Sequence, residues 1–169
     1  MNIRPISFKG MPHNYYKIDD TVSRSAQPMI DDFVWLKEQG VTDIINFRTM
    51  FKPSINFHER EVVENLGMKY HNIPTSTKTP SVENVDKFLN LVDDIKKNKG
   101  KVHIHCMAGA DRTGMYSFIY KMQEGMGSLT INVNDWIEKG HSRSRFPNLI
   151  PWALKYIKKL YPKHPPIPI

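Results

Sequence analysis

The sequence predicts a single α/β domain with a central, mostly parallel sheet of four to five strands and helices on both faces. Three observations lead to this fold class. Short strand-like runs alternate with longer segments whose apolar residues recur at helical spacing. The length of 169 residues suits one domain, and no internal repeat or low-complexity linker divides it. Such alternation is typical of parallel sheets, because each crossover between strands returns through a helix.

The first half of the chain is predicted to hold four strands and two helices. The strand segments are short, and they lie at Tyr15–Ile18, Thr21–Ser25, Val41–Phe47 and Met68–Ile73. The helix segments are Met29–Gln39 and His58–Leu66. A glycine directly follows each helix segment, as is common at helix ends because glycine adopts positive φ freely.

The second half is predicted to hold one strand and four helices. The most regular helix, Ser81–Asn98, carries its apolar residues on one face and begins at a serine suited to cap it. The strand Lys101–His105 runs directly into Cys106. Three further helical segments follow, at Met115–Met122, Ser128–Glu138 and Leu149–Leu160. We place the domain at residues 1–161 and expect a loose, proline-rich tail at residues 162–169.

Composition and charge exclude several classes of protein. The single cysteine excludes an intramolecular disulfide and suits a reducing compartment such as the cytoplasm. No apolar run is long enough to span a bilayer, and the first residues lack the apolar core of a secretory signal. The histidines include no pair spaced to hold zinc, so we expect no metal. The net charge of +7 favours an anionic partner, but basic and aromatic residues do not interleave as in nucleic-acid-binding modules.

The stretch from His105 to Gly114, HCMAGADRTG, carries the chemistry. It lies between a predicted strand and a predicted helix, so its backbone N–H groups can curl around an anion near a positive helix N-terminus. Gly109 and Gly114 permit a tight turn or a close approach. Arg112 can offer a planar pair of donors to phosphate, and the same positive field should stabilise the thiolate of Cys106. One loop would then bind a phosphoryl group and supply the nucleophile that attacks it.

This stretch resembles the signature loop of the cysteine-dependent protein tyrosine and dual-specificity phosphatases. Two further segments resemble blocks of the compact bacterial, fungal and plant members of that superfamily. They are SRSAQP at residues 23–28, similar to an RS-x-Q-P block, and INFR at residues 45–48, similar to an NLR block. The resemblance covers residues 15–120 and implies a phosphatase fold like that of the protein tyrosine phosphatases.

The resemblance also implies a role for each loop residue. Cys106 would form a covalent phosphocysteine, and the Thr113 hydroxyl would assist its thiolate as leaving group. His105 and Gly114 would support the loop. The phosphate-binding residues would be Met107, Ala108, Gly109, Ala110, Asp111 and Arg112. Neither a metal nor another cofactor is implied.

One departure from the family concerns the proton donor to the leaving oxygen. The family usually supplies an aspartate from a loop before the cysteine, whereas the corresponding residues 73–80, IPTSTKTP, contain no carboxylate. Three readings stay open. Asp111 could donate the proton, although it could equally be a surface carboxylate or pair with a nearby base. Glu83, at the start of the long helix, could donate it, although it could simply serve the helix dipole.

In the third reading, departure of the leaving group needs little acid assistance. A phosphate leaving group has a second pKa near ~6, whereas a phenol has a pKa of ~10, so phosphate leaves as a much weaker base. A site without a strong acid would therefore suit phosphoanhydrides such as inositol pyrophosphates.

The basic residues outside the loop have two readings each. Arg24 and Arg48 either tie loops together through hydrogen bonds or contact the substrate. The basic run at residues 140–146, GHSRSRF, is either a solvated surface or part of the pocket rim. His103, which lies on the predicted strand before Cys106, is expected to pack rather than to react.

We therefore expect a monomeric enzyme that hydrolyses a phosphotyrosine or phosphoserine/threonine protein through a phosphocysteine. The alternatives are an inositol phosphate or pyrophosphate phosphatase and a phosphate-binding module with little turnover. Met107 and Ala110 stand where phosphoinositide 3-phosphatases carry lysines, which argues against a polyphosphorylated lipid. The expected partner is a phosphorylated protein or a small polyanionic phosphate, with no nucleic acid and no membrane span.

Overall fold

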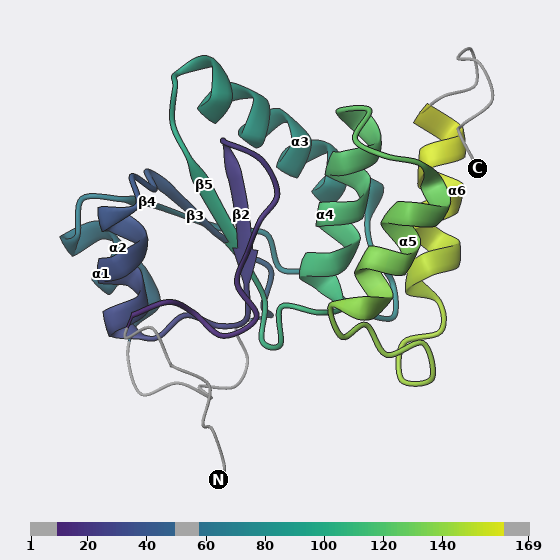
Figure 1. Ribbon diagram of the computed structural model, residues 1–169, viewed down its shortest axis with the longest axis horizontal. Helices are drawn as coiled ribbons and strands as arrows, with labels where there is room; N and C mark the ends of the chain where they lie inside the picture. Colours follow the sequence, from purple (N-terminus) through teal and green to yellow (C-terminus); the bar gives the residue numbers. More distant parts are fainter. Residues whose placement is uncertain (1–9, 50–57, 161–169) are drawn as a thin grey trace, which may run out of the picture.

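The computed structural model describes residues 10–49 and 58–160 (Figure 1), so the tail expected at residues 162–169 lies outside the described residues. Within these ranges the chain forms five strands and six helices. The strands are β1 Tyr16–Lys17, β2 Val22–Ser25, β3 Asp43–Asn46, β4 Lys69–Asn72 and β5 Val102–His105. The helices are α1 Ile30–Glu38, α2 Glu59–Asn65, α3 Val82–Lys97, α4 Arg112–Gln123, α5 Leu129–Glu138 and α6 Leu149–Leu160. None of these helices is long and apolar enough to cross a membrane.

The strands form one sheet in the order β1-β2-β5-β3-β4. Strands β2, β5, β3 and β4 are parallel to one another, and β1 is antiparallel to β2. This arrangement confirms the predicted mostly parallel sheet. Ser25 of β2 and Asn46 of β3 both lie level with His105 of β5, so the carboxyl ends of three strands meet at one edge. In open sheets of this kind, ligands bind beyond the carboxyl ends of the strands.

Helices cover both faces of the sheet (Figure 1). Helices α1 and α2 contribute to a smaller core that contains Ile44, and α3, α4, α5 and α6 contribute to a larger core that contains Ile45. The two isoleucines are neighbours in β3, and their side chains point to opposite faces because side chains alternate along a strand. Both faces of this strand are therefore buried, as is usual for a strand inside a parallel sheet.

The helix boundaries follow local signals with one exception. Ser81 caps α3, because its Oγ accepts a hydrogen bond from the N–H of Asn84 at 3.3 Å. Gly40 and Gly67, which follow α1 and α2, have φ values of 85° and 78°. Helix α4 begins at Arg112, whereas the apolar stripe predicts a start at Met115. Its first turn belongs to the polar loop motif, so no apolar pattern marks it.

Candidate active site

The loop that follows β5 lies at the carboxyl edge of the sheet. Cys106 comes directly after the last residue of β5 and is 2% exposed. The loop ends at Arg112, where α4 begins, so the N-terminus of this helix closes the loop. The first N–H groups of a helix have no partner inside the helix and carry partial positive charge. The thiol therefore lies between a strand end and a helix N-terminus.

The loop presents a row of unpaired backbone donors. Within residues 10–49 and 58–160, the N–H groups of Ala108, Gly109, Ala110 and Asp111 donate to no protein acceptor. Gly109 and Ala110 are buried residues. Backbone donors that lack a partner away from solvent are rare in folded proteins, and successive free N–H groups beside a helix N-terminus bind anions. This geometry suits the phosphate cradle that the sequence predicts.

Gly109 forms the tight turn of the loop. Its φ is +68°, and a Cβ atom there would lie 2.4 Å from the backbone N of Ala26 and from the backbone C of Ser25. Both the positive φ and the close approach exclude a larger residue. The loop is thus packed directly against the chain that leaves β2.

Two residues of the SRSAQP segment hold the loop by hydrogen bonds. Arg24 donates from Nη2 to the carbonyl oxygen of Gly109 at 2.5 Å, and the N–H of Gln27 donates to the carbonyl oxygen of Met107 at 3.0 Å. Arg48 in turn donates from Nη1 to Gln27 Oε1 at 2.7 Å. Of the two readings that the sequence leaves open for Arg24 and Arg48, these contacts support the one in which they tie loops together.

The guanidinium of Arg24 carries a buried charge. Arg24 is 1% exposed, and its Nε has no hydrogen-bond partner among the described residues. Burial lowers the pKa of Arg24, and the nearby groups Asp135, Cys106 and Tyr16 offset part of this effect. No carboxylate of the described chain lies within ion-pair distance of it. A positive charge is therefore held beside the loop and is only partly compensated.

Arg112 reaches back toward the strand ends. Its Nη1 donates to the carbonyl oxygen of Phe47 at 3.4 Å. The N–H of Phe47 donates to the carbonyl oxygen of His105 at 2.9 Å, so Phe47 lies beside the residue that precedes Cys106. The guanidinium of Arg112 is thus turned toward the sheet edge where the thiol lies. A bond this long leaves its donors available to an anion.

Thr113 and Gly114 form the buried first turn of α4. The hydroxyl of Thr113 has no hydrogen-bond partner among the described residues, and no bond joins it to Cys106 Sγ in this structure. A Cβ atom on Gly114 would lie 2.1 Å from the ring of Trp136. The Nε1 of Trp136 donates to the carbonyl oxygen of Ala110 at 3.0 Å. Trp136, which the sequence marks only as an apolar helix residue, therefore supports the loop from α5.

His105 connects the loop to α2. Its Nε2 lies 2.6 Å from Glu59 Oε1, and its Nδ1 lies 3.2 Å from the carbonyl oxygen of Cys106. Sequence reasoning missed Glu59, because an acid in the first turn of a helix is usual and signals nothing beyond the helix dipole. His103 is buried and bonds to Ser23 and Ser25, in line with a packing role.

Two residues of the segment that follows α5 form hydrogen bonds with the carboxylate of Asp111. Its Oδ1 lies 2.7 Å from His141 Nδ1 and accepts the N–H of Ser142 at 3.1 Å. The reading of the 140–146 run as a solvated surface is wrong for His141, which is buried, whereas Arg143 and Arg145 are exposed. Of the roles that the sequence leaves open for Asp111, pairing with a nearby base is the one seen here.

The loop at residues 73–80 is tied down by polar contacts. Thr75 Oγ1 lies 2.7 Å from the hydroxyl of Tyr116, whose pKa burial raises to about 12. Asn148 donates from Nδ2 to the carbonyl oxygens of Thr77 and Lys78. Glu83 is exposed in the first turn of α3, where it stabilises the helix dipole.

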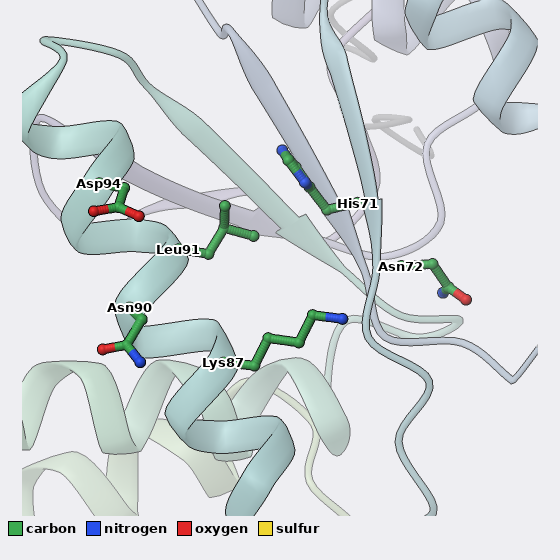
Figure 2. Close-up of a pocket in the computed structure, with 6 residues that line it drawn as sticks. All are labelled: His71, Asn72, Lys87, Asn90, Leu91 and Asp94. Carbon is green, nitrogen blue, oxygen red and sulfur yellow. The ribbon is translucent and has the colours of Figure 1, made fainter.

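A separate open pocket of 380 Å³ lies between α3 and the edge strand β4 (Figure 2). Its lining residues are His71, Asn72, Lys87, Asn90, Leu91 and Asp94. In Figure 2 the side chain of Lys87 extends from α3 toward β4. None of residues 105–114 lines this pocket, so it is distinct from the loop after β5. In the described part of the chain, no three His, Cys, Asp or Glu side chains are grouped to hold a metal ion.

Comparison with known proteins adds a family relationship. A family model described as polymorphic toxin system, DSP-PTPase phosphatase, matches residues 20–126. This range contains the SRSAQP segment, the INFR segment and the whole loop after β5. No curated protein is significantly similar in sequence to this chain.

Several solved structures share the fold. A DUF442 protein from Shewanella putrefaciens CN-32 matches with a TM-score of 0.70 and 22% identity, over 91% of this chain and 92% of its own. TpbA from P. aeruginosa, in complex with pTyr, matches with a TM-score of 0.72 and 15% identity, over 89% and 91%. The core catalytic domain of the PP-IP phosphatase SIW14 from S. cerevisiae matches with a TM-score of 0.71 and 20% identity, over 94% and 98%. These likenesses establish the fold.

Proposed function

This chain belongs to the DSP-PTPase phosphatase family of polymorphic toxin systems, and we propose that it hydrolyses phosphate esters through a phosphocysteine on Cys106. The observation that carries the proposal is the arrangement of the loop after β5. A cysteine, a row of unpaired N–H groups and an arginine turned toward the same sheet edge come from one short stretch. Such a loop can hold a phosphoryl dianion and place phosphorus against sulfur.

The proposed reaction has two steps. In the first, the thiolate of Cys106 attacks phosphorus, so that an S–P bond forms while the P–O bond to the leaving group breaks. The electron pair of that bond stays on the leaving oxygen, which takes up a proton. In the second step, water attacks phosphorus, loses a proton and releases the sulfur as thiolate together with inorganic phosphate. Arg112 and the loop N–H groups stabilise the charge on the transferred phosphoryl oxygens in both steps.

Several neighbours keep the loop in place before substrate arrives. Arg24 and Gln27 hold carbonyl groups of the loop from the β2 side, and Trp136 holds the carbonyl of Ala110 from α5. With these carbonyls bonded outward, the N–H groups stay free for the anion. Donors that are fixed in advance cost no reorganisation during the reaction. The hydroxyl of Thr113, which has no partner among the described residues, would donate a hydrogen bond to the leaving sulfur in the second step.

The first substrate class that we propose is a phosphotyrosine or phosphoserine/threonine protein. The fold shared with TpbA, which binds pTyr, supports it. The exposed Arg143 and Arg145 near the loop would favour acidic surroundings of the phosphoryl group.

A second substrate class, phosphoanhydrides, is favoured by the surroundings of the possible proton donors. The carboxylate of Asp111 accepts two hydrogen bonds, Glu83 is exposed on α3, and residues 73–80 contain no carboxylate. A phosphate leaving group needs little protonation, so a site without a free acid suits it. The fold shared with the PP-IP phosphatase SIW14 supports inositol pyrophosphates as the members to test.

A phosphate-release assay tests the proposal. The panel contains a phosphotyrosine peptide, a phosphoserine peptide and an inositol pyrophosphate, each tested with the wild-type protein, Cys106→Ser and Arg112→Ala. We expect turnover of at least one compound by the wild type, none by Cys106→Ser and a large loss in Arg112→Ala. Turnover by purified, folded Cys106→Ser would exclude the mechanism. Binding of phosphate by the wild type without turnover of any compound would instead identify a phosphate-binding module.

A further inference from the structure

A buried polar cluster lies behind Cys106, where α2 meets the carboxyl ends of β3 and β5. At its centre is Glu59, the first residue of α2, which is 6% exposed. Glu59 Oε2 accepts hydrogen bonds from Gln27 Nε2 at 2.9 Å and from Asn46 Nδ2 at 3.2 Å. Glu59 Oε1 lies 2.6 Å from His105 Nε2. Three side chains from three different segments therefore converge on one carboxylate.

The orientation of both amide groups is fixed by a residue that can only donate. Arg48 donates from Nη1 to Gln27 Oε1 at 2.7 Å, so the NH₂ group of Gln27 is the part that faces Glu59. The backbone N–H of Arg48 donates to Asn46 Oδ1 at 2.8 Å, so the NH₂ group of Asn46 also faces Glu59. Glu59 Oε2 thus accepts two N–H donors. An oxygen that accepts two such bonds carries no proton, and Oε1 is the oxygen of Glu59 that faces His105.

His105 faces an acceptor at each ring nitrogen. Its Nδ1 lies 3.2 Å from the carbonyl oxygen of Cys106, which can only accept. Its Nε2 faces Glu59 Oε1 at 2.6 Å. A histidine that donates from both nitrogens is an imidazolium ion. Because His105 is fully buried, a charge on its ring would need a paired anion, and Glu59 is the carboxylate placed to supply one.

We propose that Glu59 is a positioning residue that keeps His105 protonated, with the imidazolium held between the carbonyl oxygen of Cys106 and the carboxylate of Glu59. The positive charge, held on the residue that precedes Cys106 in the chain, would favour the reactive thiolate. The proposal rests on the proposed use of Cys106 as nucleophile. Glu59 would act only through His105, since no described contact joins Glu59 to the loop itself.

Two further titratable groups lie near this pair. They are His103 on β5, which interacts with His105, and Tyr70 on β4, which interacts with Glu59. Burial lowers the pKa of His103 well below its usual value, and the charge of His105 lowers it further, so His103 is neutral. Burial raises the pKa of Tyr70, and so does the charge of Glu59. Among the described residues, Glu59 is therefore the carboxylate that pairs with His105.

The protonation state of His105 can be measured directly in the wild-type protein. Nitrogen-15 NMR of the histidine side chains separates a doubly protonated ring from either neutral tautomer. We expect both nitrogens of His105, assigned through the loss of its signals in His105→Gln, to be protonated at mildly alkaline pH. A neutral His105 ring under these conditions would overturn the proposal. This measurement needs no Glu59 variant, so it tests the proposal even if Glu59→Gln fails to fold.

Alkylation by iodoacetamide tests the effect on Cys106, which is the one cysteine of the chain. Iodoacetamide reacts with the thiolate, so its rate reports ionisation of the sulfur without any turnover. We expect Glu59→Gln to react about tenfold more slowly than the wild type at mildly acidic pH and equally fast at alkaline pH, where the thiol ionises in both. The matched control is Glu61→Gln, which removes an exposed carboxylate from the same turn of α2 and is expected to react like the wild type.

A uniform loss of alkylation rate at all pH values would show that Glu59 only supports the loop mechanically, and an unchanged pH profile would show that it does nothing to the sulfur. Either result overturns the proposal. Failure of the proposed function looks different. If the folded Cys106→Ser variant still releases phosphate, Cys106 is not the nucleophile, while the NMR and alkylation results still report on the Glu59–His105 pair.

Discussion

Arg24 donates from Nη2 to the carbonyl oxygen of Gly109 across 2.5 Å, so a fully buried guanidinium holds the turn of the loop that follows β5. The bond turns this carbonyl away from the anion site, and the charge of Arg24 lies on the protein side of the loop. One side chain therefore contributes both shape and positive potential. The SRSAQP segment resembles a block of the phosphatase family, and Arg24 of that segment makes the contact that holds the loop in this chain.

Replacement of Arg24 by methionine should weaken both the loop and its anion binding. The variant leaves the Gly109 carbonyl without its donor, which costs about 1–3 kcal/mol of the free energy of unfolding. It also removes a poorly hydrated positive charge, so the Kd for inorganic phosphate should rise several-fold. Urea denaturation and calorimetric titration measure the two effects. Arg60→Met is the control, because it removes an exposed arginine that pairs with Glu64 on α2 and lies over the ring of Tyr70. It should lower the stability less than Arg24→Met does and leave the Kd for phosphate unchanged.

Substitution of Gly109 by alanine should be much more costly than the same substitution at Gly125. Both glycines have a φ of +68°, but a Cβ on Gly125 meets nothing within 4 Å, whereas one on Gly109 meets the backbone of Ala26. Gly125→Ala should cost about 1–2 kcal/mol for the left-handed backbone alone. Gly109→Ala should cost about 1–3 kcal/mol more for the clash. Equal costs in urea denaturation would show that the loop does not pack on β2 as described.

Asp111 gives a comparison between two substitutions. Asparagine keeps an oxygen that can accept the N–H of Ser142, so Asp111→Asn should retain most turnover of every substrate. Alanine removes the anchor of the chain around His141, so Asp111→Ala should lose turnover of all substrates alike. Steady-state kinetics on the substrate panel measures both variants. An equally severe loss of ester hydrolysis in both variants, with anhydride hydrolysis kept, would identify Asp111 as the proton donor instead.

His103 should make the protein less stable in mild acid. Its pKa in the folded state is well below the usual 6.5 because it is buried. Below about pH 6.5 the unfolded chain binds a proton that the native state does not, so the free energy of unfolding falls by up to ~1.4 kcal/mol per pH unit. Above that pH the contribution is fully present. The slope of stability between pH 7 and 5 should be smaller in His103→Gln than in the wild type, and unchanged in the exposed control His13→Gln.

The sequence predicts the framework of this protein well because the framework depends on local patterns. Apolar spacing identifies the described helices, and β-branched runs such as that ending at Phe47 identify buried strands. The start of α4 is the exception, because Arg112, Thr113 and Gly114 are set by the loop chemistry and not by an apolar face.

The supports of the candidate site are less predictable, because they depend on which segments meet in space. Glu59 reads as an ordinary first-turn acid, Trp136 as an apolar helix residue and His141 as part of a basic run. Their contacts with His105, Ala110 and the carboxylate of Asp111 join positions 26 to 46 residues apart in the chain. No local pattern encodes such distances. Only the fold shows that these residues surround the loop.

The phosphocysteine itself tests the central claim most directly. The wild-type protein is mixed with a phosphorylated substrate that it turns over, quenched in acid within milliseconds, digested and analysed by mass spectrometry. We predict that the peptide with Cys106 gains one phosphoryl group, that the gain disappears as substrate is exhausted, and that it is absent in Cys106→Ser. Phosphate release by the wild type with no phosphorylated Cys106 peptide at any time, or with the phosphoryl group on another residue, would contradict the account.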